Sequence, residues 1–244
     1  SAMALSAASL CLSVKPCTKQ GLTERHRLAA ERAIADNEIR NEVLRQLGEL
    51  AKSLEGALLN VVRLKELAPR AQDYIMSFGE KFSAALFCGI LRDLGLESRW
   101  LTGQEAGVFT NNHFGSAQPL MKLTSYEAKE VLGPLLNKGV VPVVTGFIGA
   151  TPEGVTTTLG RGGSDYSATI LAVALEADEV CIWSDVDGLM TADPRIEERA
   201  QTIALISYDE AIEMAYFGAK GMHPKALEPA AEVGIPVRIK NTFS

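Results

Sequence analysis

The richest group of chemically useful residues lies at positions 160–165, which read Gly-Arg-Gly-Gly-Ser-Asp. Glycines let the backbone approach a ligand closely and adopt unusual dihedral angles. Arg161 offers a planar fork of donors that suits a carboxylate or a phosphate. Ser164 could cap a following helix, whose first unpaired N–H groups would hold an anion. A plain tight turn is the alternative, but Arg161, Ser164 and Asp165 packed into one turn favour an anion site.

A second loop, at 184–195, carries charged side chains just after an expected strand. Asp185 and Asp187 could bind ribose hydroxyls or a cation there, although Asp and Gly are also typical of an ordinary turn. Arg195 follows Pro194 in a turn that the proline makes rigid, which suits contact with a phosphate. The pattern leaves both the nucleotide and the plain-turn interpretation open.

A third loop, at 217–224, places Lys220 among small residues, just before a helix that is expected to start near Pro224. A lysine there can reach nucleotide phosphates as a point charge. The neighbouring His223 is more typical of a structural hydrogen-bonding residue than of a catalyst. A fourth loop follows the last expected strand and reads Ile-Lys-Asn-Thr at 239–242.

Residues 77–80, Ser-Phe-Gly-Glu, are expected to open a helix that runs to about residue 94. Near a helix start, Glu80 could be a surface charge that complements the helix dipole. Beside a glycine at a ligand cleft, Glu80 could instead bind the ammonium group of a substrate. No His and Cys metal cluster, H-E-x-x-H, G-x-S-x-G or P-loop pattern occurs, so we expect neither a protein-bound metal nor a Walker-type nucleotide site.

The elements that must position these loops alternate between helices and strands in the second half of the chain. Periodicity and composition predict helices over 21–56 with a break at Asp36-Asn37, and over 57–68, 77–94, 126–137, 165–177, 208–217 and 224–233. Apolar runs predict strands over 140–147, buried on both faces, and over 155–159, 180–183 and 235–239. This order predicts an α/β sandwich with a largely parallel sheet, in which ligands gather at the carboxyl ends of the strands.

The composition describes an ordinary globular domain. The chain has 244 residues, of which 47% are hydrophobic, and 24 basic against 30 acidic residues give a formal charge of −6. This balance argues against a general nucleic-acid binder, and no run approaches the roughly 20 apolar residues of a membrane span. The start, Ser-Ala-Met-Ala, reads as a cloning remnant ahead of a native segment, without the pattern of a signal peptide.

The four cysteines show no C-x-x-C spacing. Cys88 and Cys181 lie in apolar runs and are expected to be buried thiols. Cys11 and Cys17 could pair in principle, but reduced, flexible thiols are the simpler interpretation. Together these features predict a cytoplasmic protein.

The loops, taken in order, resemble the catalytic domain of the aspartate kinases, in the amino acid kinase family. The resemblance covers about residues 24–243, with additional similarity at 144–147. It is carried by segments 77–80, 157–165, 183–188 with 191–195, 217–220 with 223–224, and 236–237 with 240–243. It implies a three-layer α/β/α sandwich and a homo-oligomer. Residues 1–244 are expected to form one catalytic domain, incomplete at its N-terminus, with no C-terminal regulatory domain present.

The resemblance further implies transfer of the ATP γ-phosphoryl group to the side-chain carboxylate of L-aspartate, the first step toward lysine, threonine and methionine. Glu80 would hold the substrate ammonium, Arg161 its α-carboxylate, and Asp165 would order the cationic groups around the phosphoryl. The further substrate-binding residues implied are Ser77, Gly162 and Ser164. The implied nucleotide-binding residues are Ser184, Asp185, Asp187, Met190, Arg195, Lys220, Lys240 and Asn241. Mg²⁺ would come with ATP, held mainly by phosphate oxygens and water.

Three departures from the family pattern affect this expectation. The family opens with a strand and a Lys-Phe-Gly-Gly-Thr-Ser loop, whereas here residues 5–7 resemble the end of the second strand, so the first strand-loop is expected to be missing. Lys15 and Lys19 do not lie in a glycine loop. The chain stops where aspartate kinases usually continue into regulatory domains. Met190 replaces a common aromatic, and Gly-Met at 221–222 replaces an apolar pair.

These departures predict little or no kinase activity for this exact chain. One alternative is a kinase for another amino acid or small acid, although Glu80 together with Arg161 favours an amino acid over a nucleoside monophosphate. The other alternative is a non-catalytic module that binds a nucleotide or an amino acid.

Overall fold

The computed structural model describes residues 17–192, 196–216 and 222–243. The chain divides into two compact units, Ser1–Gly160 and Arg161–Ser244, and each is described by itself. Arg195 and Lys220, two of the nucleotide-site candidates, lie outside the described residues. So do Cys11, Lys15 and the side chains of Cys17 and Lys19.

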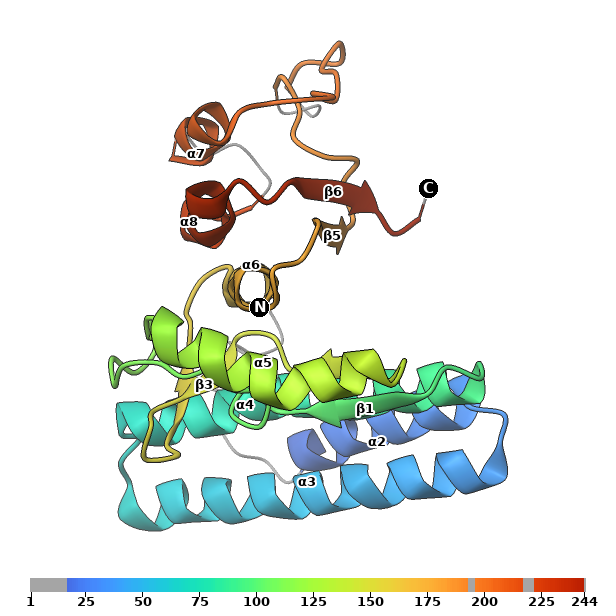
Figure 1. Cartoon of the computed structure of the whole chain (residues 1–244). Helices are drawn as coiled ribbons and strands as arrows, with labels where there is room; N and C mark the ends of the chain where they lie inside the picture. Colours follow the sequence, from blue (N-terminus) through green and yellow to red (C-terminus); the bar gives the residue numbers. More distant parts are fainter. Residues whose placement is uncertain (1–16, 193–195, 217–221, 244) are drawn as a thin grey trace. The chain divides into compact units, whose positions relative to one another are not determined.

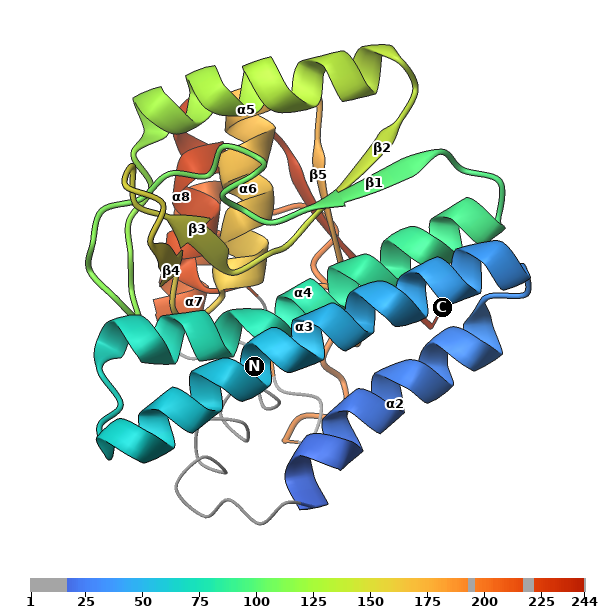
Figure 2. The same ribbon diagram turned by 90° about the horizontal axis from the view of Figure 1, so that it is seen from below.

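Three long helices form one side of the first unit: α2 (Cys17–Ala33), α3 (Asn37–Leu64) and α4 (Pro69–Asp93). Figure 2 shows them running beside one another. Their contact faces make an apolar core that consists of Ala30, Ile34, Val43, Leu47, Phe78, Phe82 and Ala85. The predicted break at Asp36 is confirmed, because this residue caps α3 and its Oδ1 accepts from Glu38 N at 2.8 Å and from Ile39 N at 2.9 Å.

The predicted ends of the helices between residues 56 and 77 are wrong. Instead of separate helices over 57–68 and from 77 onward, α3 continues unbroken to Leu64 and α4 begins at Pro69. Lys65 ends α3 in a left-handed conformation, with φ of 54°. Proline lacks an N–H, so it ends a helix that precedes it but is well tolerated in the first turn of one that follows. Ser77 and Glu80 therefore lie in the middle of α4.

The strands of the first unit form two small sheets. β1 (Ser98–Leu101) pairs in parallel with β2 (Val141–Val144), and the connection between them contains α5 (Met121–Asn137), which starts earlier than residue 126. β3 (Ile148–Ala150) pairs antiparallel with β4 (Thr156–Thr158), inside the predicted strand 155–159. The short β1 and β3 were not predicted. β2 is not buried on both faces as expected, since Val141 is exposed and, among the described residues, the strand pairs with β1 alone.

The second unit consists of α6 (Gly163–Leu175), β5 (Val180–Ser184), α7 (Tyr208–Tyr216), α8 (Pro224–Val233) and β6 (Val237–Asn241). β5 and β6 are parallel and in register, with Ser184 opposite Asn241, and α6 packs against α8. Figure 1 shows this unit in orange to red. The predicted elements are confirmed here within a few residues. Cys88 is buried as expected, whereas Cys181 on β5 is only half-buried.

One helix in the described part of the chain, α4, has the length and hydropathy that a membrane span would need. Nearly half of its apolar stretch is buried inside the unit, and Phe78 and Phe82 belong to the core. Central helices of globular domains have these same properties, so the pattern is weak evidence for a span.

Asp93, at the end of α4, anchors the corner between α2 and α3. Its Oδ2 accepts from Ala35 N at 3.0 Å and its Oδ1 from Asp36 N at 2.8 Å. These two hydrogen bonds lower the pKa of Asp93 from its ordinary 3.8. A lowered folded-state pKa contributes stability above the ordinary pKa, and this contribution is lost as the pH falls through the folded-state value.

We therefore expect Asp93→Asn to destabilise the protein more at pH 7 than at acid pH below the ordinary pKa of Asp93. Urea unfolding of the wild type and the variant at both pH values measures this difference. Asp209→Asn, at an exposed position on α7, is the matched control and should cost little at either pH. An Asp93→Asn penalty that is the same at both pH values would contradict the anchoring role.

Candidate functional site

α4 carries a polar stripe within an otherwise apolar helix. Asp73, Ser77 and Glu80 are spaced i, i+4 and i+7, so they lie on one face of the helix. All three are removed from solvent to a large degree, since Asp73 and Ser77 are buried and Glu80 is partly buried. The interpretation of Glu80 as a charge near a helix start is therefore wrong, and its position in mid-helix points to another role.

Glu80 is a desolvated carboxylate. None of the ion pairs or hydrogen bonds between described residues involves it, and burial raises the pKa of its carboxyl above the ordinary value. A carboxylate in such surroundings gains most from a cationic partner. The next residue, Lys81, does not supply that charge, because its ammonium group lies over the rings of Tyr74 and Phe78, at 4.9 and 4.7 Å from their centroids.

Ser77 uses its proton within its own helix. Its hydroxyl donates to the carbonyl oxygen of Tyr74 at 2.6 Å. The oxygen of the hydroxyl can still accept a hydrogen bond, but the residue is fully buried, so contact with a substrate N–H group would require the packing around it to open.

The glycine loop leads directly into α6. Gly162 is the N-cap residue, with φ of 69° and no side-chain cap, and the first hydrogen bond of the helix runs from Tyr166 N to Gly162 O at 2.9 Å. The expectation that Ser164 caps the helix is wrong, because it lies inside the first turn with its side chain exposed. The backbone N–H groups of residues 163–165 have no acceptor among the described residues, so this helix start can receive an anion.

Two candidate side chains flank this helix start. Arg161 is exposed, and its guanidinium is not engaged in any ion pair between described residues. Asp165, in the first turn, is half-buried, and burial raises the pKa of its carboxyl. His223 is confirmed in the structural role expected for it, since it is the N-cap of α8 and its Nδ1 accepts from Lys225 N at 3.3 Å.

The carboxyl ends of β5 and β6 lie side by side, as parallel pairing requires. Asn241 Nδ2 donates to Asp187 Oδ1 at 2.9 Å, and Thr242 N donates to the carbonyl of Ser184 at 2.8 Å. Ser184 Oγ in turn donates to Asp185 Oδ1 at 3.2 Å. This arrangement brings together four of the predicted nucleotide-site residues, namely Ser184, Asp185, Asp187 and Asn241.

Lys240 and Met190 belong to the same unit. The ammonium group of Lys240 lies 5.5 Å from the centre of the exposed Trp183 ring, across the strand pair. Met190 is half-buried and makes a β-bridge with Thr202, so backbone pairing holds it in place. Among the described residues, no group of three or more His, Cys, Asp or Glu side chains could hold a metal ion.

Sequence reasoning missed Asp73. Its Oδ2 accepts from Thr158 N at 2.8 Å and from Gly115 N at 2.9 Å, and its Oδ1 accepts from Thr158 Oγ1 at 2.9 Å. The only available signal was an acidic residue one helical turn before Ser77. That signal was lost because the helix was expected to begin at Ser77.

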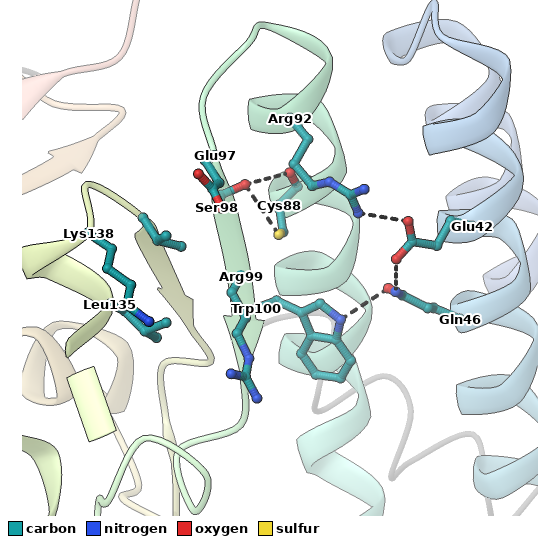
Figure 3. A pocket seen from close by; sticks show the side chains of 11 residues that line it. Glu42, Gln46, Cys88, Arg92, Glu97, Ser98, Arg99, Trp100, Leu135 and Lys138 are labelled. Atoms are coloured by element: carbon teal, nitrogen blue, oxygen red, sulfur yellow. Dashed lines mark hydrogen bonds and ion pairs between the residues drawn. The ribbon is translucent and has the colours of Figure 1, made fainter. Parts of the chain in front are cut away.

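A separate hollow of about 520 Å³ lies among α3, α4, β1 and the end of α5. Figure 3 shows a chain of hydrogen bonds across it. Arg92 donates to Glu42 at 2.9 Å, Gln46 donates to Glu42 at 3.1 Å, and Trp100 Nε1 donates to Gln46 at 3.0 Å. The polar groups of these side chains are therefore hydrogen-bonded to one another. None of the predicted site residues lines this hollow.

Comparison with known proteins assigns the chain to a family. The model of the amino acid kinase family matches residues 9–241. The chain belongs to the amino acid kinase family. The sequence is 41% identical over 199 residues to chloroplastic aspartokinase 3 of Arabidopsis thaliana, and the match covers 81% of this chain and 36% of that protein. It is 42% identical over 207 residues to lysine-sensitive aspartokinase 3 of Escherichia coli K12, with coverage of 85% and 44%.

The fold of the chain is also similar to that of solved aspartokinase structures. A crystal structure of E. coli aspartokinase III in complex with aspartate and ADP matches with a TM-score of 0.86 and 36% identity, over 99% of this chain and 53% of that one. A second structure of that enzyme, with lysine and aspartate, matches with a TM-score of 0.70 and 37% identity over 92% and 54%. The amino acid kinase fold is therefore confirmed. The chain spans about a third to a half of the length of these relatives.

Proposed function

We propose that this chain is the catalytic domain of an aspartate kinase, which transfers the γ-phosphoryl group of ATP to the side-chain carboxylate of L-aspartate. The observation that carries the proposal is the start of α6, where N–H groups without an acceptor in the described part of the chain follow the left-handed Gly162 and the exposed Arg161. Such a helix start, with a guanidinium beside it, is suited to anionic substrate groups. Support comes from the aspartokinases that match most of the chain at about 40% identity.

Glu80 is the residue that selects an amino acid as the acceptor. A nucleoside monophosphate has no ammonium group to offer a desolvated carboxylate, whereas aspartate does. In the proposed complex Glu80 binds that ammonium, and Arg161 binds the α-carboxylate with two parallel hydrogen bonds. Ser77, Gly162 and Ser164 provide the remaining polar contacts to the amino acid.

In the reaction an oxygen of the aspartate side chain forms a bond to the γ-phosphorus, and the bond from that phosphorus to the β,γ-bridging oxygen of ATP breaks. The bonding pair leaves with ADP, and the products are 4-phospho-L-aspartate and ADP. Phosphoryl transfer of this kind requires alignment and neutralisation of charge more than covalent help from the protein. Asp165 orders the cationic groups around the transferred phosphoryl.

The ends of β5 and β6 form the proposed nucleotide side of the site. Ser184 and Asp185 contact the nucleoside, with Asp187, Met190, Lys240 and Asn241 beside them, and Arg195 and Lys220 contact the phosphates. Mg²⁺ would enter with ATP and neutralise phosphate charge. The carboxylates of Asp185 and Asp187 are hard oxygen ligands that could complement its phosphate and water ligands.

The same proposal covers the wider setting of the protein. Formation of 4-phospho-L-aspartate would be the first step toward lysine, threonine and methionine, in a cytoplasmic homo-oligomer. The crystal structures with aspartate, ADP and lysine support small-molecule ligands for the related enzyme.

The test measures binding and turnover separately, because the chain spans only about a third to a half of the length of its relatives. Isothermal titration with L-aspartate and with MgADP should show one site for each, and N-acetyl-L-aspartate, which has no ammonium group, should not bind. Trapping of the acyl phosphate with hydroxylamine reports turnover with ATP. A chain that binds neither L-aspartate nor MgADP would contradict the proposal, as would one that binds N-acetyl-L-aspartate equally well.

A further inference from the structure

Among the described residues of the first unit, Asp73 has a side chain that accepts three long-range hydrogen bonds. Its carboxylate is buried, with 1% of the residue exposed, and it accepts three hydrogen bonds from two segments distant in sequence. Burial raises the pKa of its carboxyl, and the hydrogen bonds from Gly115 and Thr158 act in the opposite direction. A buried carboxylate surrounded by donors holds those donors firmly, since each loses a partner when the carboxylate is removed.

The two segments held by Asp73 also contact each other. Ala117 N donates to the carbonyl of Thr158 at 2.9 Å, so Thr158 is bound through its N–H group, its hydroxyl and its carbonyl. Gly160, two residues further along, has φ of 81°, and a Cβ there would lie 3.0 Å from the carbonyl oxygen of Gly115. The end of β4 is therefore held against the 115–117 segment up to the residue before Arg161.

The same contact sets the orientation of α4. Helix α4 packs against β4, and Asp73 joins the two through buried hydrogen bonds. Ser77 and Glu80 follow Asp73 one and two turns along the same face of the helix. A rotation or shift of α4 that moved Glu80 would have to break the bonds of Asp73.

We propose that Asp73 is a positioning residue for the amino-acid subsite, which clamps α4 to the end of β4 so that Glu80 stays in place for the substrate ammonium. This inference rests on the proposed function. It predicts that loosening the clamp weakens binding of the amino acid more than binding of the nucleotide, whose proposed residues lie in the second unit. If Asp73 had only a structural role, its loss would lower the stability of the fold and would change the affinities for aspartate and for MgADP to the same extent.

Thr158→Val is the sharpest probe, because it removes one hydrogen bond to Asp73 with little change of shape and keeps the backbone N–H donor. We expect the dissociation constant of L-aspartate, measured by titration calorimetry on the full chain, to rise about 10-fold, as the loss of one bond to a charged group implies. The dissociation constant of MgADP should stay near the wild-type value. Thr158→Ser restores the hydroxyl and should restore the affinity for aspartate.

Asp73→Asn should have a larger effect than Thr158→Val. The amide NH₂ group would replace one carboxylate oxygen and face backbone N–H groups that need an acceptor. We expect this variant to bind aspartate more weakly still, or not to fold. Two results with Thr158→Val would overturn the role of Asp73: unchanged affinity for aspartate, or equal losses for aspartate and MgADP. A wild-type chain that binds MgADP but not L-aspartate would instead contradict the proposed substrate, and the positioning role with it.

Discussion

Glu80→Gln should weaken the binding of L-aspartate about 100-fold, since a charge-assisted hydrogen bond in a desolvated site is replaced by a neutral one. Glutamine has nearly the same shape as glutamate, so packing in the middle of α4 is preserved. The loss therefore reports the charge of Glu80 and not its volume. Titration calorimetry with L-aspartate and MgADP measures it, and MgADP should bind the variant as it binds the wild type.

The pH dependence of aspartate binding provides an independent check on Glu80. Burial raises the pKa of its carboxyl above the ordinary 4.5, so protonation begins at a higher pH than for an exposed glutamate. The ionised form is the one that binds an ammonium. Affinity for aspartate should therefore decline as the pH falls from neutral toward the raised pKa, and Glu80→Gln should remove this part of the pH dependence.

The matched control is Glu130→Gln, at an exposed position on α5, which should leave both affinities unchanged. Equal affinity of the wild type and Glu80→Gln for L-aspartate would show that the ammonium binds elsewhere. Equal losses for aspartate and MgADP would point to a general disturbance of the fold.

Gly162→Ala should destabilise the protein by about 3 kcal/mol, from two separate causes. A left-handed conformation costs a non-glycine residue about 1–2 kcal/mol, and overpacking at a close contact adds about 1–3 kcal/mol. At Gly162, φ is 69° and an added Cβ would lie 2.6 Å from Cβ of His223. The glycine is required both for the turn and for the close approach of the loop to the start of α8. Urea unfolding measures the difference.

Two variants separate these causes. Gly48→Ala in α3 is the control, because nothing lies within 4 Å of a Cβ there, and it should stabilise the protein by about 0.5–1 kcal/mol through helix propensity. His223→Gly removes the opposing Cβ together with the N-cap of α8, so it serves as the background of a double-mutant comparison: Gly162→Ala made in His223→Gly should show the dihedral cost without the steric part. Stability of Gly162→Ala equal to that of Gly48→Ala would contradict both causes.

Local sequence signals were sufficient where the determinant lies within a few residues. Asp36 marked a helix start because its side chain caps N–H groups only two and three residues away. The apolar runs marked β2 and β5, and the expected parallel sheet placed the candidate loops at the carboxyl ends of its strands, where the pairing of β5 with β6 brings two of them together. The same signals were ambiguous at Pro69, because a proline can end one helix or begin the next. That ambiguity moved the expected start of α4 to Ser77.

The sequence by itself determined the elements of the second unit, the glycine loop before α6 and the residue types available for an anion and a nucleotide. Only the tertiary structure decided that Glu80 is desolvated, that Gly162 lies against His223, and that Asp73 joins α4 to Thr158 across 85 positions of the chain. The physical reason is the separation along the sequence over which each kind of interaction acts. Capping, turn and strand preferences depend on near neighbours, whereas burial and long-range hydrogen bonds depend on segments that become neighbours only when the chain has folded.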